Sequence, residues 1–339
     1  MPPLTSLSQL HDIRTMLPAA DNHTRRVAME RQKLLTKPGG SLGRLEEIAV
    51  WLAAWQGIAN PKLDLCQTIV FAGNHGIAAK GVSAFPSAVT EQMVANFQSG
   101  GAAINQLCES VGSSLDVHAL DLDCATADFS EKAAMSSEVC LEAINKGINA
   151  VNPDADIVAL GEMGIGNTTA AAAICCGLFG GDPSLWVGRG TGVDDTTLAL
   201  KAKLIRSAIT LHGAQLDDPV AILRCLGGRE IAALFGAILS ARFHRIPVIL
   251  DGFVCTTAAA PLAALAMGAL DHCLVGHRSV EPGHNRLLEK LEKRSVLDLD
   301  MRLGEASGAA VALGIIKSAV AVHNGMATFT EAGVSERQS

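Results

Sequence analysis

The stretch that decides the fold is residues 157–169, which read IVALGEMGIGNTT. The apolar run up to Gly161 is typical of a buried strand, and the glycines after it predict a tight loop. The Ala-rich residues 169–179 that follow predict a helix. The same order of strand, small or acidic residue and helix recurs along the chain. It predicts an α/β fold with a parallel sheet that is covered by helices on both faces.

Outside this stretch, short apolar runs and longer helical patterns alternate. The apolar runs are four to seven residues long and end in Gly, Asp or His, which favours strands over buried helices. We expect strands at residues 68–73, 115–121, 157–161, 247–252 and 272–277. We expect helices at residues 88–108, 130–150, 169–179, 195–212, 230–244, 253–270 and 306–322. The sequence does not give the order of the strands in the sheet.

The two ends of the chain differ from its middle. Residues 1–60 contain two helical patterns and no strand, interrupted by KPGGSLG at residues 37–43. We expect them to form a small helical domain together with residues 306–330, and we expect residues 61–305 to form a large α/β domain. Residues 253–270 are uncharged and as long as a membrane span. Because they are Ala-rich and lack basic flanks, we expect a buried helix there.

Composition limits the partners and the compartment. The formal net charge is -7, and no Lys/Arg cluster is long enough to form a nucleic-acid surface. The nine cysteines include no Cys-x-x-Cys pair, so they predict neither a zinc site nor a disulfide framework. Free cysteines are typical of a reducing compartment, and the first residues lack the apolar core of a signal peptide. We therefore expect a cytoplasmic protein that does not enter a membrane.

Two glycine-rich loops open expected helices, at residues 161–169 and 188–195. Backbone amides at a helix N-terminus bind anions, and glycine lets a ligand approach the backbone closely. The loops therefore predict a phosphate cradle, although such turns are also common as purely structural features. The candidate phosphate ligands are Gly164, Gly166, Asn167, Thr168, Gly188, Gly190 and Gly192.

The spacing of the glycines disfavours several classes of ligand. The first loop reads G-x-x-G-x-G rather than the dinucleotide fingerprint G-x-G-x-x-G, and no G-x-x-x-x-G-K-[ST] occurs. Asp251 follows a strand but lacks the second acid of a magnesium–pyrophosphate site. We therefore expect a monophosphate ligand, without a metal and without a cofactor. Lys201 could reach that phosphate or be a solvated helix lysine, and His75 could be functional or structural.

A single carboxylate stands before the last long apolar segment. Residues 301–310 read MRLGEASGAA, and the Ala/Gly-rich residues from 306 to 322 carry one charge, at Lys317. Glu305 is thus expected beside the first turn of a buried helix. It could be an acid stabilised by the positive end of the helix dipole. It could also be a general base in a pocket, with a pKa raised by desolvation.

Six motifs in order resemble one family, the nicotinate-nucleotide–dimethylbenzimidazole phosphoribosyltransferases of cobalamin assembly. They are KPGGSLGRL at residues 37–45, NHG at 74–76, the segment 81–90, GEMG with NTT within 161–169, LDGF at 250–253, and RLGE with SGAA within 302–310. The resemblance covers nearly the whole chain. It implies a doubly wound, mostly parallel, Rossmann-like α/β domain, a small helical domain built from both termini, and a homodimer. It also implies the transfer of phosphoribosyl from nicotinate mononucleotide to 5,6-dimethylbenzimidazole, giving α-ribazole 5′-phosphate and nicotinate.

The resemblance assigns roles to individual residues. The family's general base falls on Glu305, which favours the second interpretation of that residue. Glu162 is assigned to stabilising the ribose or its oxocarbenium ion, and Lys201 to the phosphate. The remaining candidate substrate contacts are Phe85, Pro86, Met93, Leu303 and Asp251.

The chain departs from some family members at the expected acceptor pocket. Those members carry Ser immediately before the proline and Gln seven residues after it, whereas this chain has Phe85 and Met93. The pocket is therefore expected to be more apolar. Two alternatives stay open: the same reaction with adenine, another benzimidazole or a phenolic acceptor, and a non-catalytic mononucleotide sensor. The combination of Glu305, Glu162 and Lys201 favours an enzyme, because a sensor needs no proton acceptor.

Overall fold

The computed structural model describes residues 1–190 and 192–335. Its centre is a sheet of six parallel strands in the order β2-β1-β3-β4-β5-β6. The expected α/β fold with a parallel sheet is therefore confirmed, and all five expected strands are present. The strands are β1 (Cys66–Ala72), β2 (Ser114–Ala119), β3 (Ile157–Met163), β4 (Val248–Leu250), β5 (Cys273–His277) and the unexpected β6 (Ser295–Leu297).

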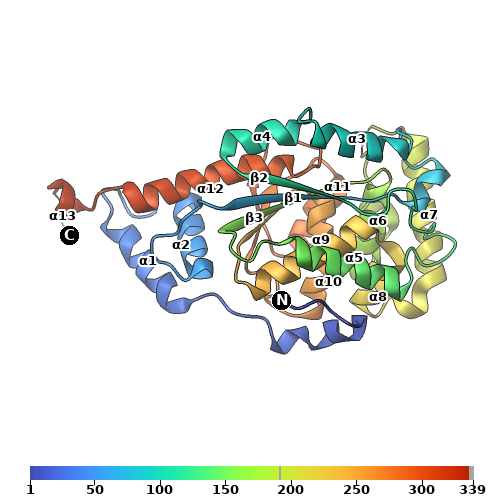
Figure 1. Ribbon diagram of the computed structural model, residues 1–339, viewed down its shortest axis with the longest axis horizontal. Helices are drawn as coiled ribbons and strands as arrows, with labels where there is room; N and C mark the ends of the chain where they lie inside the picture. Colours follow the sequence, from blue (N-terminus) through green and yellow to red (C-terminus); the bar gives the residue numbers. More distant parts are fainter. Residues whose placement is uncertain (191, 336–339) are drawn as a thin grey trace.

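Side chains alternate between the two faces of the sheet, as the two-residue period of a strand requires. In β1, Ile69 and Phe71 belong to one hydrophobic cluster, which also takes residues from α5, α6, α8, α9 and α10. Val70 points to the opposite face and belongs to a second cluster, with residues from α2, α4 and α12. Both faces are therefore buried under helices (Figure 1).

Two groups of helices cover the two faces of the sheet. On the face of the first cluster lie α5 (Ser137–Ala150), α6 (Asn167–Phe179), α8 (Pro219–Leu226), α9 (Arg229–Phe243) and α10 (Phe253–Leu265), with α7 (Asp195–His212) packed on α6. On the other face lie α2 (Arg44–Gln56), α4 (Ala103–Val111) and α12 (Ser307–Gly325). The remaining helices are α1 (Asn22–Leu34), α3 (Ala88–Gln98), α11 (Pro282–Lys290) and α13 (Phe329–Ala332), together with short 3-10 turns at Leu7–Thr15, Gly76–Lys80, Pro183–Leu185 and Gly213–Gln215.

Two expected helices need correction. The segment 88–108 forms two helices, because the chain turns at Gly100, whose φ of +81° is the left-handed conformation that favours glycine. The helix expected from residue 130 begins only at Ser137, where the Ser136 hydroxyl caps it by accepting from the Val139 N–H. The helix expected at 195–212 is observed with those bounds.

Helices α1 and α2 form a lobe with the last turns of α12 at one end of the molecule, whereas the N-terminus itself lies against the α/β body (Figure 1). Gln32 Nε2 lies 2.7 Å from His323 Nδ1, and His323 Nε2 lies 3.0 Å from the Ala59 carbonyl. The first residues behave differently: Leu10 and Ile13 are buried in the cluster of the α/β body. We therefore propose that the small helical unit comprises residues 22–60 and the C-terminal part of α12.

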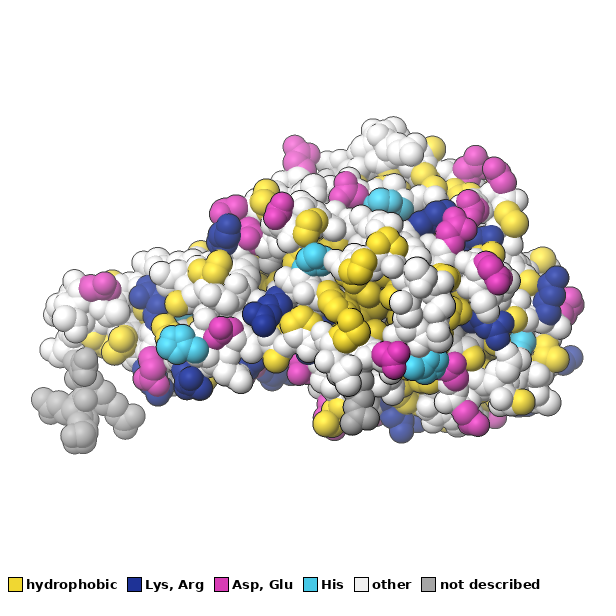
Figure 2. All heavy atoms as spheres, turned by 60° about the horizontal axis from the view of Figure 1, so that its bottom comes forward, with side chains coloured by type: hydrophobic (Ala, Val, Ile, Leu, Met, Phe, Trp, Pro, Cys, Tyr) yellow, Lys and Arg dark blue, Asp and Glu magenta, His cyan; other side chains and the backbone are white. Residues whose placement is uncertain are grey.

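Helix α12 is long and apolar enough, by length and composition alone, to cross a membrane, but half of its most apolar window is buried within the fold. Ala309, Leu313 and Ile316 on its buried face pack in the second cluster, which is the environment of a core helix. Acidic and basic side chains are interspersed over the face shown in Figure 2.

Candidate active site

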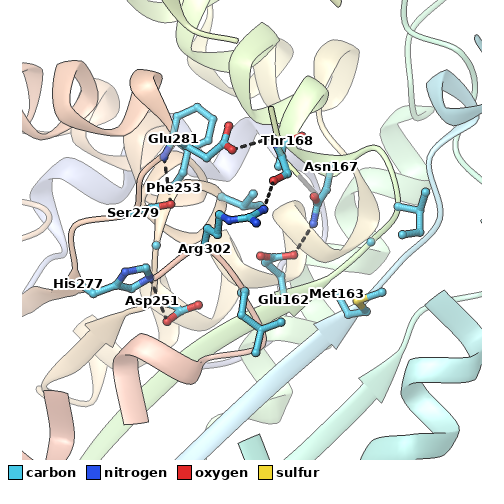
Figure 3. Close-up of a pocket in the computed structure, with 17 residues that line it drawn as sticks. Glu162, Met163, Asn167, Thr168, Asp251, Phe253, His277, Ser279, Glu281 and Arg302 are labelled. Carbon is cyan, nitrogen blue, oxygen red and sulfur yellow. Dashed lines mark hydrogen bonds and ion pairs between the residues drawn. The ribbon is translucent and has the colours of Figure 1, made fainter. Parts of the chain in front are cut away.

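A cavity opens at the carboxyl ends of β3, β4 and β5, where ligands bind in open parallel sheets (Figure 3). About 640 Å³ of atom-free space lies within it, part of which is open to solvent. Seven of the candidate residues line it: Glu162, Gly164, Asn167, Thr168, Gly190, Asp251 and Leu303. The sequence did not indicate its other polar lining residues, which are His277, Ser279, Glu281 and Arg302.

Glu162, near the end of β3, faces the cavity beside Asn167 (Figure 3). The Asn167 amide donates a hydrogen bond to its carboxylate, and Asn167 is the first residue of α6. Burial, followed by the negative charges of Asp251 and Glu230, raises the pKa of Glu162 to about 8. A cation bound beside Glu162 would favour its ionised form and so lower this pKa.

Asp251 follows β4 and is almost fully buried. Its Oδ1 accepts a hydrogen bond of 2.9 Å from the Ala309 N–H in the first turn of α12, and His277 Nε2 lies 3.7 Å from the same oxygen. Its Oδ2 has no hydrogen-bond partner among the described residues. Burial raises the pKa of this carboxyl to about 7. Asp251 thus ties the start of α12 to the floor of the cavity.

Glu305 lies in a turn of three residues with left-handed backbone, Gly304, Glu305 and Ala306, at φ of +86°, +62° and +65°. Such a conformation costs free energy for a residue with a side chain, so the surrounding packing must enforce it. That packing comes from β3: a Cβ on Gly161 would lie 2.1 Å from the Ala306 nitrogen, so only glycine lets the turn approach. The Glu305 N–H donates to the Glu162 carbonyl at 3.2 Å, which places the two acids side by side.

The Glu305 side chain has the properties of a base rather than of a helix cap. Helix α12 has no hydrogen bond from its N-cap side chain, and its Ala309 amide donates to Asp251, so Glu305 does not cap this helix. Glu305 is only 4% exposed, and its Oε2 has no hydrogen-bond partner in the part of the chain that the structure describes. Burial raises its pKa to about 7, where a general base works best at neutral pH. Glu305 does not line the enclosed part of the cavity and lies behind Gly304, which does.

Lys201 is buried behind the two glycine loops, so it is not a solvated helix lysine. Its Nζ donates to the Gly188 carbonyl at 3.1 Å and to Thr168 Oγ1 at 3.3 Å. Burial lowers its pKa. Gly190, at φ +52°, presents its N–H to Glu281 Oε1 at 2.7 Å. Lys201 and Glu281 together hold the second loop against the first, and the structure thereby brings the two candidate phosphate loops into one site.

Three other glycines of these loops lie outside the lining of the cavity. Gly166, at φ +95°, precedes α6, and a Cβ there would lie 3.4 Å from Ala78. A Cβ on Gly188 would meet the Glu281 carboxylate at 2.0 Å. Gly192, at φ +115°, has open space around it. These glycines shape the loops without facing the cavity.

The candidate acceptor residues come from the loop before α3, from α3 itself and from the loop before α12. The N-terminal turn of α3 packs against the β3–α6 loop, since the Ile165 N–H donates to Thr90 Oγ1 at 3.2 Å. Phe85 is 49% exposed and Leu303 is 56% exposed. Met93 packs against the cluster that contains Ala306, and Pro86 is exposed just before α3. Of these four residues only Leu303 lines the enclosed cavity, so the structure does not gather them into a closed acceptor pocket.

No cysteine lines this cavity, and its acids and His277 do not form a metal-binding group among the described residues. All nine cysteines are free, and only Cys124 is exposed. Within residues 1–190 and 192–335, no three His, Cys, Asp or Glu side chains are grouped so that they could hold a metal ion. His75 does not line the cavity and forms a buried pair with Glu230.

Comparison with known proteins identifies the class of this fold and site. Residues 17–334 match the family model described as phosphoribosyltransferase, and the chain belongs to this family. It is 56% identical over 336 residues to the nicotinate-nucleotide–dimethylbenzimidazole phosphoribosyltransferase of Ruegeria sp. (strain TM1040), with 99% of both chains covered. It is 55% identical to the protein of that name from Mesorhizobium japonicum, with 99% of this chain and 100% of the relative covered.

A solved structure agrees with the relatives. The crystal structure of the enzyme of that name from Thermus thermophilus superposes with a TM-score of 0.86, at 37% identity, over 94% of this chain and 100% of that one. The resemblance noted from the sequence motifs is therefore confirmed, and so is the α/β fold class.

Proposed function

We propose that this phosphoribosyltransferase transfers the phosphoribosyl group of nicotinate mononucleotide to 5,6-dimethylbenzimidazole, giving α-ribazole 5′-phosphate and nicotinate, in the assembly of the cobalamin nucleotide loop. Relatives that match over nearly their full length bear the name of this reaction. The observation that carries the proposal is Glu305, a buried carboxylate with a free oxygen beside the cavity. A sensor of mononucleotides would have no use for such a proton acceptor.

The donor's phosphate is assigned to the two glycine loops. The N-terminus of α6, the Thr168 hydroxyl and the Gly190 backbone meet there, with the Lys201 ammonium behind them. Helix N-termini and buried cations both stabilise a phosphate. The ribose then lies toward Glu162, which accepts a hydrogen bond from Asn167 of the first loop and is assigned to the charge that develops at the ribose.

The reaction needs only one proton acceptor. A ring nitrogen of the acceptor base attacks C1 of the ribose while the bond from C1 to the pyridinium nitrogen breaks, and nicotinate leaves with that electron pair. The other ring nitrogen of the acceptor loses its proton to Glu305. The donor is already a cationic leaving group, so ionised Glu162 stabilises the oxocarbenium-like transition state without a metal. Attack opposite the leaving group converts a β-nucleotide into an α-nucleoside.

The acceptor is bound by apolar contact. Phe85 and Leu303 offer exposed apolar surface, and Met93 packs against the cluster that contains Ala306. We propose that these side chains, with Pro86, close around the planar base when it binds, which favours recognition by stacking and shape. We also propose that the protein works as a homodimer in the cytoplasm, supported by its free cysteines and by the exposed Met29 and Leu34 on the helical lobe.

The test is to mix the protein with nicotinate mononucleotide and one base at a time, and to measure nicotinate by chromatography. We expect release that depends on 5,6-dimethylbenzimidazole, with little release when no base is added. Tight donor binding without release by any base would instead identify a sensor. Equal release with and without base would identify a hydrolase.

A further inference from the structure

A buried pair of ionisable side chains lies against the floor of the donor cavity. His75 Nε2 lies 2.5 Å from Glu230 Oε1, and the two side chains are 1% and 0% exposed. His75 follows β1, and Glu230 is the second residue of α9. Neither side chain lines the cavity, so neither touches the donor directly.

Three glycines from three separate segments close around this pair. A Cβ on Gly73 would lie 2.6 Å from Glu230 Oε2, and one on Gly228 would lie 2.2 Å from His75 Cε1. A Cβ on Gly164, which lines the cavity, would meet Glu230 Oε1 at 3.3 Å and His75 Nε2 at 3.4 Å. The pair thus fills the space between the end of β1, the β3–α6 loop and the start of α9.

Stability alone does not account for the pair. His75 Nδ1 and Glu230 Oε2 are buried and have no hydrogen-bond partner within the described chain. Burying ionisable groups is costly, and apolar side chains of similar volume in such positions are commonly neutral or stabilising. Buried polar groups with missing partners therefore call for another explanation, and functional sites are a common one.

The pair is connected to the catalytic acid through the backbone. The Gly73 N–H donates to the Met163 carbonyl at 3.0 Å, which joins the chain two residues before His75 to the residue after Glu162 at the ends of two neighbouring strands. We propose that the His75–Glu230 pair is a positioning element that holds the β3–α6 loop, and with it the Glu162 carboxyl, in place for the donor. This inference rests on the proposed function, because it assigns the pair a role through Glu162.

The pair acts on Glu162 electrostatically as well as by filling space, because Glu230 is one of the acids that face Glu162. The groups that face Glu162 are Asp251 after β4, Glu305 before α12, Glu230 on α9 and the Asn167 amide on α6. The carboxylates favour the protonated form of Glu162, and Asn167 favours the ionised form. Glu230 thus adds to burial and to Asp251 in raising the pKa of Glu162.

The test uses Glu230→Gln, which keeps the size of the side chain and an oxygen that accepts from His75. Glu109→Gln, at an exposed position on α4, is the matched control. The apparent pKa of Glu162 is measured in the ligand-free protein by carbon-13 NMR of its carboxyl, assigned by comparison with Glu162→Gln. We expect it to fall by about one unit in Glu230→Gln and to stay unchanged in the control.

Kinetics give the second readout. We expect kcat of Glu230→Gln to fall by roughly tenfold with an unchanged KM for the acceptor. His75→Gln should lower kcat as well, whereas His212→Gln, which removes a buried histidine far from the site, should not. If Glu230→Gln does not fold, His75→Gln and its control His212→Gln still test the inference.

An unchanged Glu162 titration together with kcat within about twofold of the wild type would overturn the inference. The titration needs no turnover, so it tests the inference even if the proposed reaction is wrong. If the wild-type protein does not catalyse the transfer, that result contradicts only the proposed function.

Discussion

Replacing Glu305 with Gln removes a proton acceptor and keeps the volume of the side chain. In the proposed reaction the acceptor's proton then has no base to go to, so kcat should fall by at least about 10²-fold. The KM for nicotinate mononucleotide should change little, since the carboxylate acts on the acceptor. Initial rates of nicotinate release at saturating donor measure both quantities.

The raised pKa of Glu305 determines how both kcat/KM and the folding stability depend on pH, so the same substitution should change both. Glu305 must be ionised to act, so kcat/KM of the wild type should fall as the pH drops below about 7, the pKa that burial gives this carboxyl. In the folded protein the carboxyl keeps its proton up to that pH, whereas the unfolded chain releases it near the ordinary glutamate pKa of 4.5. The unfolded state therefore gains stability relative to the folded state as the pH rises through this window.

The size of this effect follows from the difference between the two pKa values. A carboxyl raised from 4.5 to about 7 costs about 3 kcal/mol of folding free energy once it is ionised at pH 8. Glu305→Gln should thus be more stable than the wild type by up to about 3 kcal/mol at pH 8, and by nearly nothing at pH 4. Urea unfolding of both proteins at the two pH values measures the difference. A variant that keeps near-normal turnover, or gains no stability at pH 8, would refute the assignment of Glu305 as a buried base.

Further predictions concern the donor, the metal and the acceptor. Replacing Gly190 with Val should raise the KM for nicotinate mononucleotide, because a side chain there would meet Thr168 Oγ1 at 3.2 Å and the backbone has φ +52°. An unchanged KM would show that the phosphate binds elsewhere. Nicotinate riboside, which lacks the phosphate, should be a poor donor in the same assay. Added chelator should leave the rate of nicotinate release intact, and a strict need for magnesium would contradict the mechanism. In a competition of equal concentrations, 5,6-dimethylbenzimidazole should react best, unsubstituted benzimidazole within roughly 10–200-fold, and adenine more slowly; adenine winning would reveal polar groups in the acceptor pocket.

The sequence predicted those strands, loops and helices whose structure is determined by residues close together in the chain. The strand, glycine loop and helix from Ile157 to Phe179 were readable because a buried strand, a left-handed Gly166 and an Ala-rich helix each have a short-range signal. Strand β6 was missed because its three residues are only half-buried and form no apolar run, unlike the equally short but fully buried β4. The break between α3 and α4 was visible as Gly100-Gly101 but was outweighed by the apolar pattern around it.

The site was only partly predictable, because distant segments form it. Glu281 approaches Gly190 across the sheet edge, and nothing in the local sequence of either residue indicates that contact. The adjacency of Glu305 and Glu162 depends on a left-handed turn that packs on Gly161, again a tertiary effect. His277 was visible as the last residue of an expected strand, where lining residues are common, and could have been named.

The most direct test of the central claim is the configuration of the product. In the proposed reaction the acceptor's ring nitrogen attacks C1 of the ribose opposite the leaving nicotinate while Glu305 takes the acceptor's proton, so the anomeric centre must invert. Proton NMR of the product formed from nicotinate mononucleotide and 5,6-dimethylbenzimidazole reports this configuration through the coupling of the anomeric proton. The account predicts the α-nucleotide alone; a β-nucleotide, or ribose 5-phosphate formed by water, would contradict it.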